Sequence, residues 1–405
     1  MSATPATALT LQEYVPRLVS RERLSDAAGT LLWRHYADQV RVEFPSPITG
    51  GQWRLTSTGW VGYIPLEPHL GIALHPKVPL HDLFRMLEYA YDLRSFRLLD
   101  DQFDCQSLEE LYERLAGILA RKILDRARDG MYRDYVARTE QLPYIAGAVD
   151  VVRLARRPWD VQPECTYHEH TVDIDDNQIL AWALFTITRS GLCTERTRAS
   201  VRRAYRQLQS TVTLTPVRAG DCVGRRYHRL NADYAPLHAL CRFFLEHSGP
   251  HYEAGEHTML PFLVDMARLY EQFVVAWLRA HLPSNITLAA QERYEIDPSS
   301  GLAFAIDVVL SDSRSGAALC VLDTKYKRVD MPATADVAQV VAYAQAKHCR
   351  DSLLAYPQAP ARPLDAIIGD VRVRSVTFAL GDDLENAGAS FLDQVLFSYS
   401  RALYP

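Results

Sequence analysis

Residues 302–327 read LAFAIDVVLSDSRSGAALCVLDTKYK, two apolar segments joined by the polar turn SDSRSG. Two apolar runs separated by a short polar turn predict a hairpin of two β-strands. Successive side chains of a strand alternate between its faces, so Asp323 and Lys325, two positions apart, project to the same side. The hairpin brings Asp307, on the first strand, close to Asp323. The segment therefore predicts two carboxylates and one ammonium group at one place on a sheet.

This arrangement predicts a metal site. Two like charges held close together in an apolar sheet are costly unless a cation or a proton shares them. A hard divalent metal with oxygen ligands is the usual solution, so we expect Asp307 and Asp323 to bind such an ion. Such an ion activates water and neutralises charge on a phosphate, and Lys325 adds a fixed positive charge. The simpler alternative is a surface ion pair of the two acids with Lys325 or Lys327.

The flanking segments favour the metal site and set the fold of the final third. Glu271 lies within the apolar run LYEQFVVAW (269–277), where an acid needs a polar site beside it. Gln339 and Tyr343, four residues apart, share one face of a predicted helix. The order of elements is a helix over 259–282, three strands, the helix 335–348, a strand over 371–380 and a closing helix over 386–404. This order predicts a mixed α/β domain.

The rest of the chain predicts a multidomain α+β protein. The whole chain has 405 residues, a length that is typical of two or three domains. Strand-like segments between 28 and 78, beginning with LLWRHY (31–36), predict a β-rich N-terminal module. Helical periodicity follows Pro79 and recurs over 108–129. We expect the middle third to be all helix and loop. The predicted domains are 1–150, the β-rich and helical part; 151–255, a helical linking region; and 256–405, the mixed α/β domain.

Charge and composition exclude several classes of protein. The net charge is −5, so the whole molecule does not attract nucleic acid, and any contact must come from a local patch. Residues 196–229 hold nine arginines against one acid, which predicts a phosphate-contacting patch or a solvated helix face. Seven cysteines without a CxxC pair, no basic leader and no long apolar run predict a cytoplasmic protein without a membrane span. The candidate DNA contacts are Arg202, Arg203, Arg206, Arg225 and Arg226.

The predicted site resembles that of the PD-(D/E)xK nuclease superfamily. Asp307 matches its first acid, Asp323 and Lys325 match the D-x-K element, and Glu271 matches the acid of the leading helix. Gln339 and Tyr343 match the Q-x-x-x-Y helix motif, whereas Ile306 stands where the family name has proline.

Nearly the whole chain is similar to the McrC family, the nuclease subunits of McrBC-type modification-dependent restriction systems. The segments that carry the similarity are VGYIPL (61–66), LHPKVPLHDLFRMLEYAYDL (74–93), RDYVARTEQLPYIAGAVDV (133–151), DIDDNQILAWAL (173–184), LYEQFV (269–274) and VLDTKYK (321–327). The resemblance implies a Mg²⁺-dependent endonuclease that cuts methylcytosine-containing double-stranded DNA. It also implies that residues 1–150 dock on a hexameric McrB-like AAA+ GTPase ring and stimulate it. The chain has no G-x-x-x-x-G-K-[ST] motif, so GTP enters only through this partner.

Three alternatives remain at this point. The chain could be a non-catalytic adaptor that activates the AAA+ ring. It could instead be a helicase-linked exonuclease, because Q-x-x-x-Y also occurs in RecB-like nucleases. Finally, ECTYHEH (164–170) could hold zinc, although its spacing matches no zinc pattern and a polar loop with a helix cap around Asp176 is the simpler interpretation.

Overall fold

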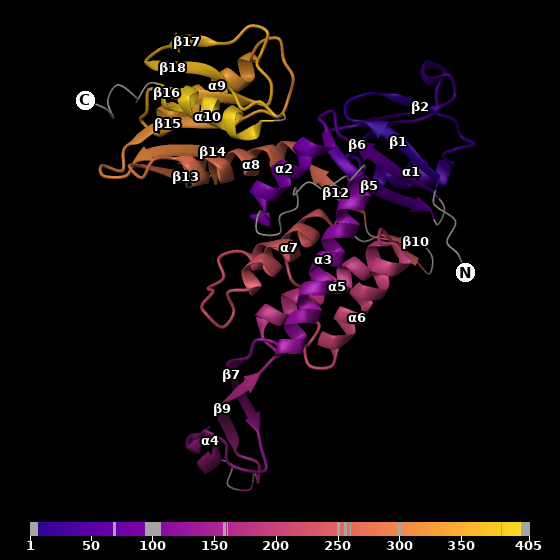
Figure 1. Ribbon diagram of the computed structural model, residues 1–405, viewed down its shortest axis with the longest axis vertical. Helices are drawn as coiled ribbons and strands as arrows, with labels where there is room; N and C mark the ends of the chain where they lie inside the picture. Colours follow the sequence, from indigo (N-terminus) through magenta and orange to yellow (C-terminus); the bar gives the residue numbers. More distant parts are fainter. Residues whose placement is uncertain are drawn as a thin grey trace. The chain divides into compact units, whose positions relative to one another are not determined.

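The computed structural model describes residues 7–67, 70–93, 107–156, 159, 161–248, 252–254, 257–259, 261–297, 301–381 and 383–397. The chain divides into two compact units, each with helices and strands (Figure 1). The first comprises residues 1–7, 62–71 and 104–263, and the second comprises 8–61, 72–103 and 264–405. A mixed α/β multidomain chain with several sheets is therefore confirmed. The division at residues 150 and 255 stays a prediction.

The second unit contains a six-stranded sheet in the order β13-β14-β15-β16-β18-β17 (Figure 1). The first three strands are antiparallel, β15 is parallel to β16 and β16 to β18, and β17 is antiparallel to β18. The strands are β13 Ile286–Asp297, β14 Leu302–Asp312, β15 Ala318–Thr324, β16 Asp351–Tyr356, β17 Asp365–Ile368 and β18 Val371–Thr377. The helices that pack on them are α8 Met266–His281, α9 Thr334–Ala346 and α10 Leu384–Leu396.

The predicted hairpin between β14 and β15 is confirmed. The Asp312 carboxylate accepts hydrogen bonds from the backbone N–H groups of Arg314 and Ser315, and Gly316 supplies a left-handed residue with φ 70°. The predicted helix of residues 335–348 corresponds to α9, and a core of side chains lies between it and the sheet. Its buried members are Ile306, Val309, Val321, Val340, Tyr343, Ala344, Cys349, Leu354, Tyr356, Val371 and Val373.

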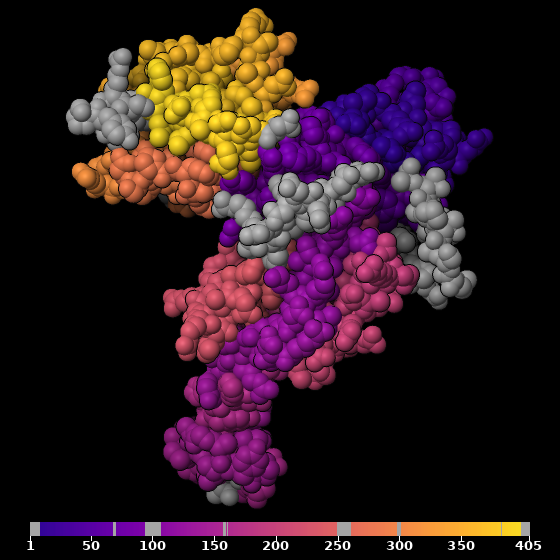
Figure 2. All heavy atoms as spheres, viewed as in Figure 1, coloured from indigo at the N-terminus to yellow at the C-terminus, as the bar shows by residue number. Residues whose placement is uncertain are grey.

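Helix α8 was predicted to begin seven residues too early. Residues 262–265 form the strand β12 Phe262–Asp265, and Asp265 then caps α8 by accepting hydrogen bonds from the N–H groups of Ala267 and Arg268. At its other end, α8 packs closely on α10, where the Trp277 ring of α8 lies against Gly388 of α10. A Cβ atom at position 388 would lie only 2.2 Å from this ring, so a larger residue would not fit there. Helix α10, yellow in Figure 2, lies at the surface of this unit. Residues 398–404 of the predicted closing helix are outside the described residues.

The N-terminal part of the second unit holds a three-stranded sheet in the order β2-β4-β3. Residues 31–36, predicted as a strand, belong instead to helix α1 Asp26–His35, which Ser25 caps by accepting from the Ala28 N–H at 3.1 Å. The elements are β2 Arg17–Val19, β3 Val40–Glu43, β4 Trp53–Ser57, the 3-10 helix η1 Pro47–Thr49 and helix α2 Leu80–Ala90. A further sheet, in the order β1-β6-β5-β12, consists of β1 Thr7–Gln12, β5 Trp60–Glu67, β6 Leu70–His75 and β12.

The first unit combines helices with strands, so the prediction that the middle third is all helix and loop is wrong. ECTYHEH lies in β9 rather than in a polar loop, and Asp176 lies in the first turn of α5. The side chains of β7 and β9 are mostly exposed, so no apolar alternation marks them as strands. The helices are α3 Leu108–Asp129, α4 Val151–Arg156, α5 Asp175–Ser190, α6 Glu195–Gln209, η3 Ala219–Cys222 and α7 Tyr234–His247. The strands are β7 Asp134–Gln141, β8 Ala148–Val149, β9 Glu164–Thr171, β10 Tyr252–Ala254 and β11 His257–Met259.

Candidate active site

Five of the predicted site residues line one cavity of about 540 Å³ in the second unit. The residues come from four elements of the unit and from the segment directly after β15. They are Glu271 of α8, Asp307 of β14, Asp323 of β15, Lys325 after β15, and Gln339 of α9. The lining also includes Asp265, Ala267, Arg268, Gln272, Gln291 and Thr324.

The β14–β15 hairpin brings the two aspartates together as predicted. The ladder pairs Val308 with Leu322, so Asp307 and Asp323 occupy the next position along the two strands. The Asp307 Oδ2 atom accepts hydrogen bonds from the Thr324 backbone N–H at 2.9 Å and from the Thr324 hydroxyl at 3.0 Å. Asp307 is thereby held against the end of β15, beside Asp323.

Lys325 is fixed at both its backbone and its ammonium group. Its N–H donates to the Ala355 carbonyl of β16 at 2.8 Å. Its Nζ lies 2.6 Å from Asp323 Oδ2 and donates to Gln339 Oε1 at 3.2 Å. Gln339 Nε2 in turn donates to the Tyr343 hydroxyl at 2.6 Å. The two residues of the Q-x-x-x-Y pattern therefore form a chain of hydrogen bonds that ends on the lysine, and Tyr343 joins the site through Gln339.

Burial and mutual repulsion disfavour charge on two of the acids. Asp323 is only 2% exposed, and burial, followed by the nearby Asp307 carboxylate, raises its pKa to about 6. Burial and the Asp307 carboxylate likewise raise the pKa of Glu271 to about 7. Hydrogen bonding to Lys325 and Gln291, respectively, opposes these shifts. A site in which one carboxylate raises the pKa of neighbouring buried acids has the electrostatic character of a cation site.

The donor set fits a hard cation in kind, because it consists of carboxylate and carboxamide oxygens. Within the described ranges, no group of three or more His, Cys, Asp or Glu side chains is arranged to hold a metal ion. Instead, each acid has a partner within the chain: Thr324 for Asp307, Lys325 for Asp323 and Gln291 for Glu271. The cavity offers the carboxylates of Asp307 and Asp323 as ligands, with those of Glu271 and Asp265 also on its lining, and neutral oxygens and water can supplement them.

Sequence reasoning missed Gln291, Arg268 and Gln272 as residues of this cavity. Arg268 precedes Glu271 by three residues on α8, and this helical spacing is the signal that could have indicated it, whereas Gln272 is adjacent to Glu271 and has no such signal. For Gln291 the signal is fainter. It lies on the strand-like segment before the hairpin, and only the pairing of β13 with β14 places it opposite Asp307.

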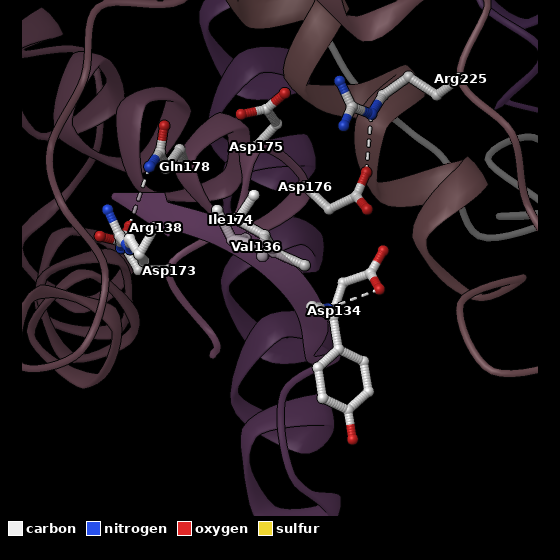
Figure 3. Close-up of a pocket in the computed structure, with 11 residues that line it drawn as sticks. Asp134, Val136, Arg138, Asp173, Ile174, Asp175, Asp176, Gln178 and Arg225 are labelled. Atoms are coloured by element: carbon white, nitrogen blue, oxygen red, sulfur yellow. Dashed lines mark hydrogen bonds and ion pairs between the residues drawn. The ribbon is translucent and has the colours of Figure 1, made fainter. Parts of the chain in front are cut away.

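The five candidate DNA contacts lie in the first unit and differ in their surroundings. Arg202, Arg203, Arg206 and Arg226 are exposed, the first three on α6. Arg225 instead forms an ion pair with Asp176, with 2.7 Å between Nε and Oδ1, and its side chain is only 22% exposed. Figure 3 shows this pair on the wall of a second cavity, of about 500 Å³, together with Asp134, Asp173 and Asp175. Arg225 is thus engaged within the chain and is less accessible to a phosphate than the four exposed arginines.

The fold and the site define a mixed α/β protein with acids and a lysine gathered in one cavity at the end of a β-hairpin. The chain belongs to the family of McrBC 5-methylcytosine restriction system components, whose family model matches residues 55–357. It is 22% identical over 264 residues to the type IV methyl-directed restriction enzyme EcoKMcrBC of Escherichia coli K12, covering 62% of this chain and 74% of that protein.

Its fold is similar to a solved structure described as a half-complex from a tetradecameric assembly of Thermococcus gammatolerans McrB AAA+ hexamers with bound McrC. The TM-score is 0.56 at 16% identity, and the match covers 96% of this chain and 100% of the matched chain. The likeness concerns the fold. In the part of the chain that the structure describes, every helix is too short or too polar to cross a bilayer.

Proposed function

We propose that this chain is the nuclease subunit of a modification-dependent restriction system, a Mg²⁺-dependent endonuclease that cuts methylcytosine-containing DNA. One observation carries the proposal. In a chain of the 5-methylcytosine restriction family, Glu271, Asp307 and Asp323 share one cavity with Lys325. Acids of this kind can hold a metal ion, and the lysine can stabilise the negative charge that develops on a phosphate during hydrolysis.

Each residue has a distinct role in the proposed reaction, following the PD-(D/E)xK pattern. Asp307 and Asp323 hold the metal ion, and Mn²⁺ can replace Mg²⁺. When bound, the ion lowers the pKa of a water molecule and offsets negative charge on the phosphate. Lys325, held between Asp323 and Gln339, orients the attacking water or the phosphate. Glu271 contributes as an outer acid, and Gln339 and Tyr343 brace the lysine.

The proposal includes a hexameric AAA+ partner that hydrolyses GTP and whose GTPase this chain stimulates. The solved structure with a similar fold is described as McrC bound to McrB AAA+ hexamers. This chain carries no Walker A sequence of its own, so GTP hydrolysis belongs to the partner. Residues 1–150 are the proposed docking part.

The test is cleavage of methylated and unmethylated plasmid with Mg²⁺ and GTP, with and without the AAA+ protein of the same system, and with Asp323→Ala as the control. We expect cutting of methylated plasmid that needs the partner, GTP and Asp323. Full cutting by Asp323→Ala contradicts the proposal. Cutting that needs free DNA ends indicates an exonuclease.

A non-catalytic adaptor is the second candidate. The partners that the three acids already have within the chain, Thr324, Lys325 and Gln291, favour it. Its signature is GTPase stimulation without cleavage under any condition. In that case, residues 1–150 alone are expected to raise the partner's GTPase rate.

A further inference from the structure

Gln291 has an unusual backbone in the middle of β13. Its φ is 51°, in the left-handed region that residues with a side chain rarely adopt. The ladder with β14 pairs Ala290 with Val308 and Glu292 with Ile306, so the register is unchanged on either side. The distortion is therefore confined to one residue of a continuous strand. Residues held in such conformations cluster at functional sites.

The strand register places Gln291 in line with the two aspartates. It lies opposite Asp307, between the pairs that flank it. Asp307 in turn lies opposite Asp323, one position beyond the pair of Val308 with Leu322. Neighbouring strands are about 4.8 Å apart, so these three residues form one short row across β13, β14 and β15. All three line the same cavity.

The Gln291 side chain connects this row to Glu271 on α8. Its carboxamide Nε2 donates a hydrogen bond to Glu271 Oε1. Glu271 has no place in the row, because it comes from a helix and not from the sheet. The next residue of β13, Glu292, instead pairs with Lys347 directly after α9. Gln291 of β13 therefore hydrogen-bonds to Glu271 of α8, whereas its neighbour Glu292 does not.

We propose that Gln291 is a positioning residue of this site, which holds the Glu271 carboxylate toward Asp307 through its N–H donor. The inference rests on the proposed nuclease function. A carboxamide is suited to this place, because it offers a donor without adding charge. A glutamate at position 291 would have no side-chain N–H donor and would add another carboxylate to a cavity already lined by those of Asp265, Glu271, Asp307 and Asp323.

The test is a double-mutant cycle on Mn²⁺ affinity, measured by titration calorimetry of the full chain without DNA or partner. If Gln291 acts through Glu271, Gln291→Ala weakens Mn²⁺ binding about 10- to 100-fold in the wild-type background, as loss of a supporting hydrogen bond does at other metal sites. In the Glu271→Ala background, the same substitution changes the affinity less than about twofold, because the group that it positions is gone. Gln291→Glu, which lacks the donor, is expected to reduce cleavage of methylated plasmid about as much as Gln291→Ala does.

Two further variants separate positioning from stability. Gln291→Gly suits the left-handed backbone, so it is expected to retain the wild-type thermal midpoint and still to lose Mn²⁺ affinity as Gln291→Ala does. Glu292→Gln, an isosteric change at the next residue, is expected to leave Mn²⁺ affinity unchanged.

Failure of this inference is distinguishable from failure of the proposed function. Equal losses of Mn²⁺ affinity from Gln291→Ala with and without Glu271, or cleavage retained by Gln291→Glu, would overturn the positioning role and leave the nuclease proposal standing. A wild-type chain that binds no Mn²⁺ and cuts no DNA beside its partner overturns both.

Discussion

The Lys77 ammonium nitrogen lies 4.2 Å from the centre of the Tyr326 ring. Lys77 belongs to the PKVP segment (76–79) that follows β6, and Tyr326 follows the proposed catalytic Lys325 directly. The same ammonium lies 3.7 Å from Glu13 Oε1, whose side chain is fully buried. Two segments about 250 residues apart in sequence therefore meet through one cation, next to the candidate active site.

Replacement of Lys77 by methionine is expected to destabilise the second unit. It leaves the buried Glu13 carboxylate without its cation, and breaking a buried pair in this way typically costs about 3–5 kcal/mol. Glu13→Gln together with Lys77→Met removes both charges and is expected to recover most of the loss. The thermal unfolding midpoint checks both variants, and a double variant no more stable than Lys77→Met contradicts the ion-pair explanation.

Asp323→Ala and Lys325→Ala are each expected to reduce plasmid cleavage by at least about 100-fold, because each removes a charged group from the reacting site. Both variants are expected to assemble with the AAA+ ring as the wild type does, which size-exclusion chromatography can measure. Lys327→Ala is the matched control, since Lys327 pairs with Asp336 and its side chain is 39% exposed. Cleavage lost equally in the control would point to a disrupted segment rather than to lost chemistry.

The chain without metal is expected to lose stability as pH rises from about 4 to about 7. The folded-state pKa values of Asp323 and Glu271 are raised to about 6 and about 7, so between the ordinary carboxyl pKa and these values the folded state binds more protons than the unfolded state. Thermal midpoints across this range in a metal chelator measure the effect. Glu271→Gln is expected to flatten the upper part of the profile, and an unchanged profile argues against a titrating Glu271.

Mg²⁺ affinity is expected to change with pH in the opposite direction. The acids must be deprotonated to bind a cation, so affinity rises as pH increases through the same interval. Calorimetric titrations at pH 5.5 and pH 8 test this expectation, and affinity independent of pH would place the ion elsewhere.

The exposed arginines of α6 are expected to contact DNA phosphates. Each phosphate contact removed from a duplex-binding surface makes the negative slope of log affinity against log salt concentration less steep by about 0.9. Arg202→Ala and Arg206→Ala should each produce such a change in fluorescence-anisotropy titrations. Arg225→Ala should leave the slope unchanged and lower the thermal midpoint, because it strands Asp176 in a mostly buried position. Equal slopes for all three variants and the wild type would favour the solvated-face interpretation.

The sequence predicted the candidate site better than the elements around it. The positions of Asp307, Asp323 and Lys325 could be predicted because the short polar turn of a hairpin is recognisable in sequence and because side chains alternate strictly between the two faces of a strand. Gln339 and Tyr343 followed from helical spacing. By contrast, β16 is buried at all six positions, including Asp351 and Ser352, so its sequence shows no alternation that would mark it as a strand. Gln291 could not be assigned a role, because its hydrogen bond to Glu271 depends on how α8 packs on the sheet.

Local propensity also misled the prediction at two places. LLWRHY is rich in residues that suit strands, yet Ser25 caps a helix there, and Gly29 allows the Trp53 ring to pack against the helix backbone. The strands β7 and β9 pair with each other over eight residues while both remain largely exposed. The two strands are held by cross-strand hydrogen bonds rather than by an apolar face. A hydrophobic pattern in the sequence reveals only an apolar face, so it could not predict these strands.

The discontinuous second unit also determines the order in which the chain can fold during synthesis. Arg85 donates to the Gly381 carbonyl at 3.3 Å and the Tyr89 hydroxyl donates to Glu385 at 2.7 Å, both across 296 residues. At 5–20 residues per second, α2 emerges from the ribosome roughly 15 to 60 s before these partners exist. Residues 104–263 can meanwhile complete most of the first unit. The nascent chain therefore exposes α2 at least until α8 has been made, because the Tyr89 ring packs on Phe273 of α8, and the cavity that holds the acids cannot be complete before α9 supplies Gln339.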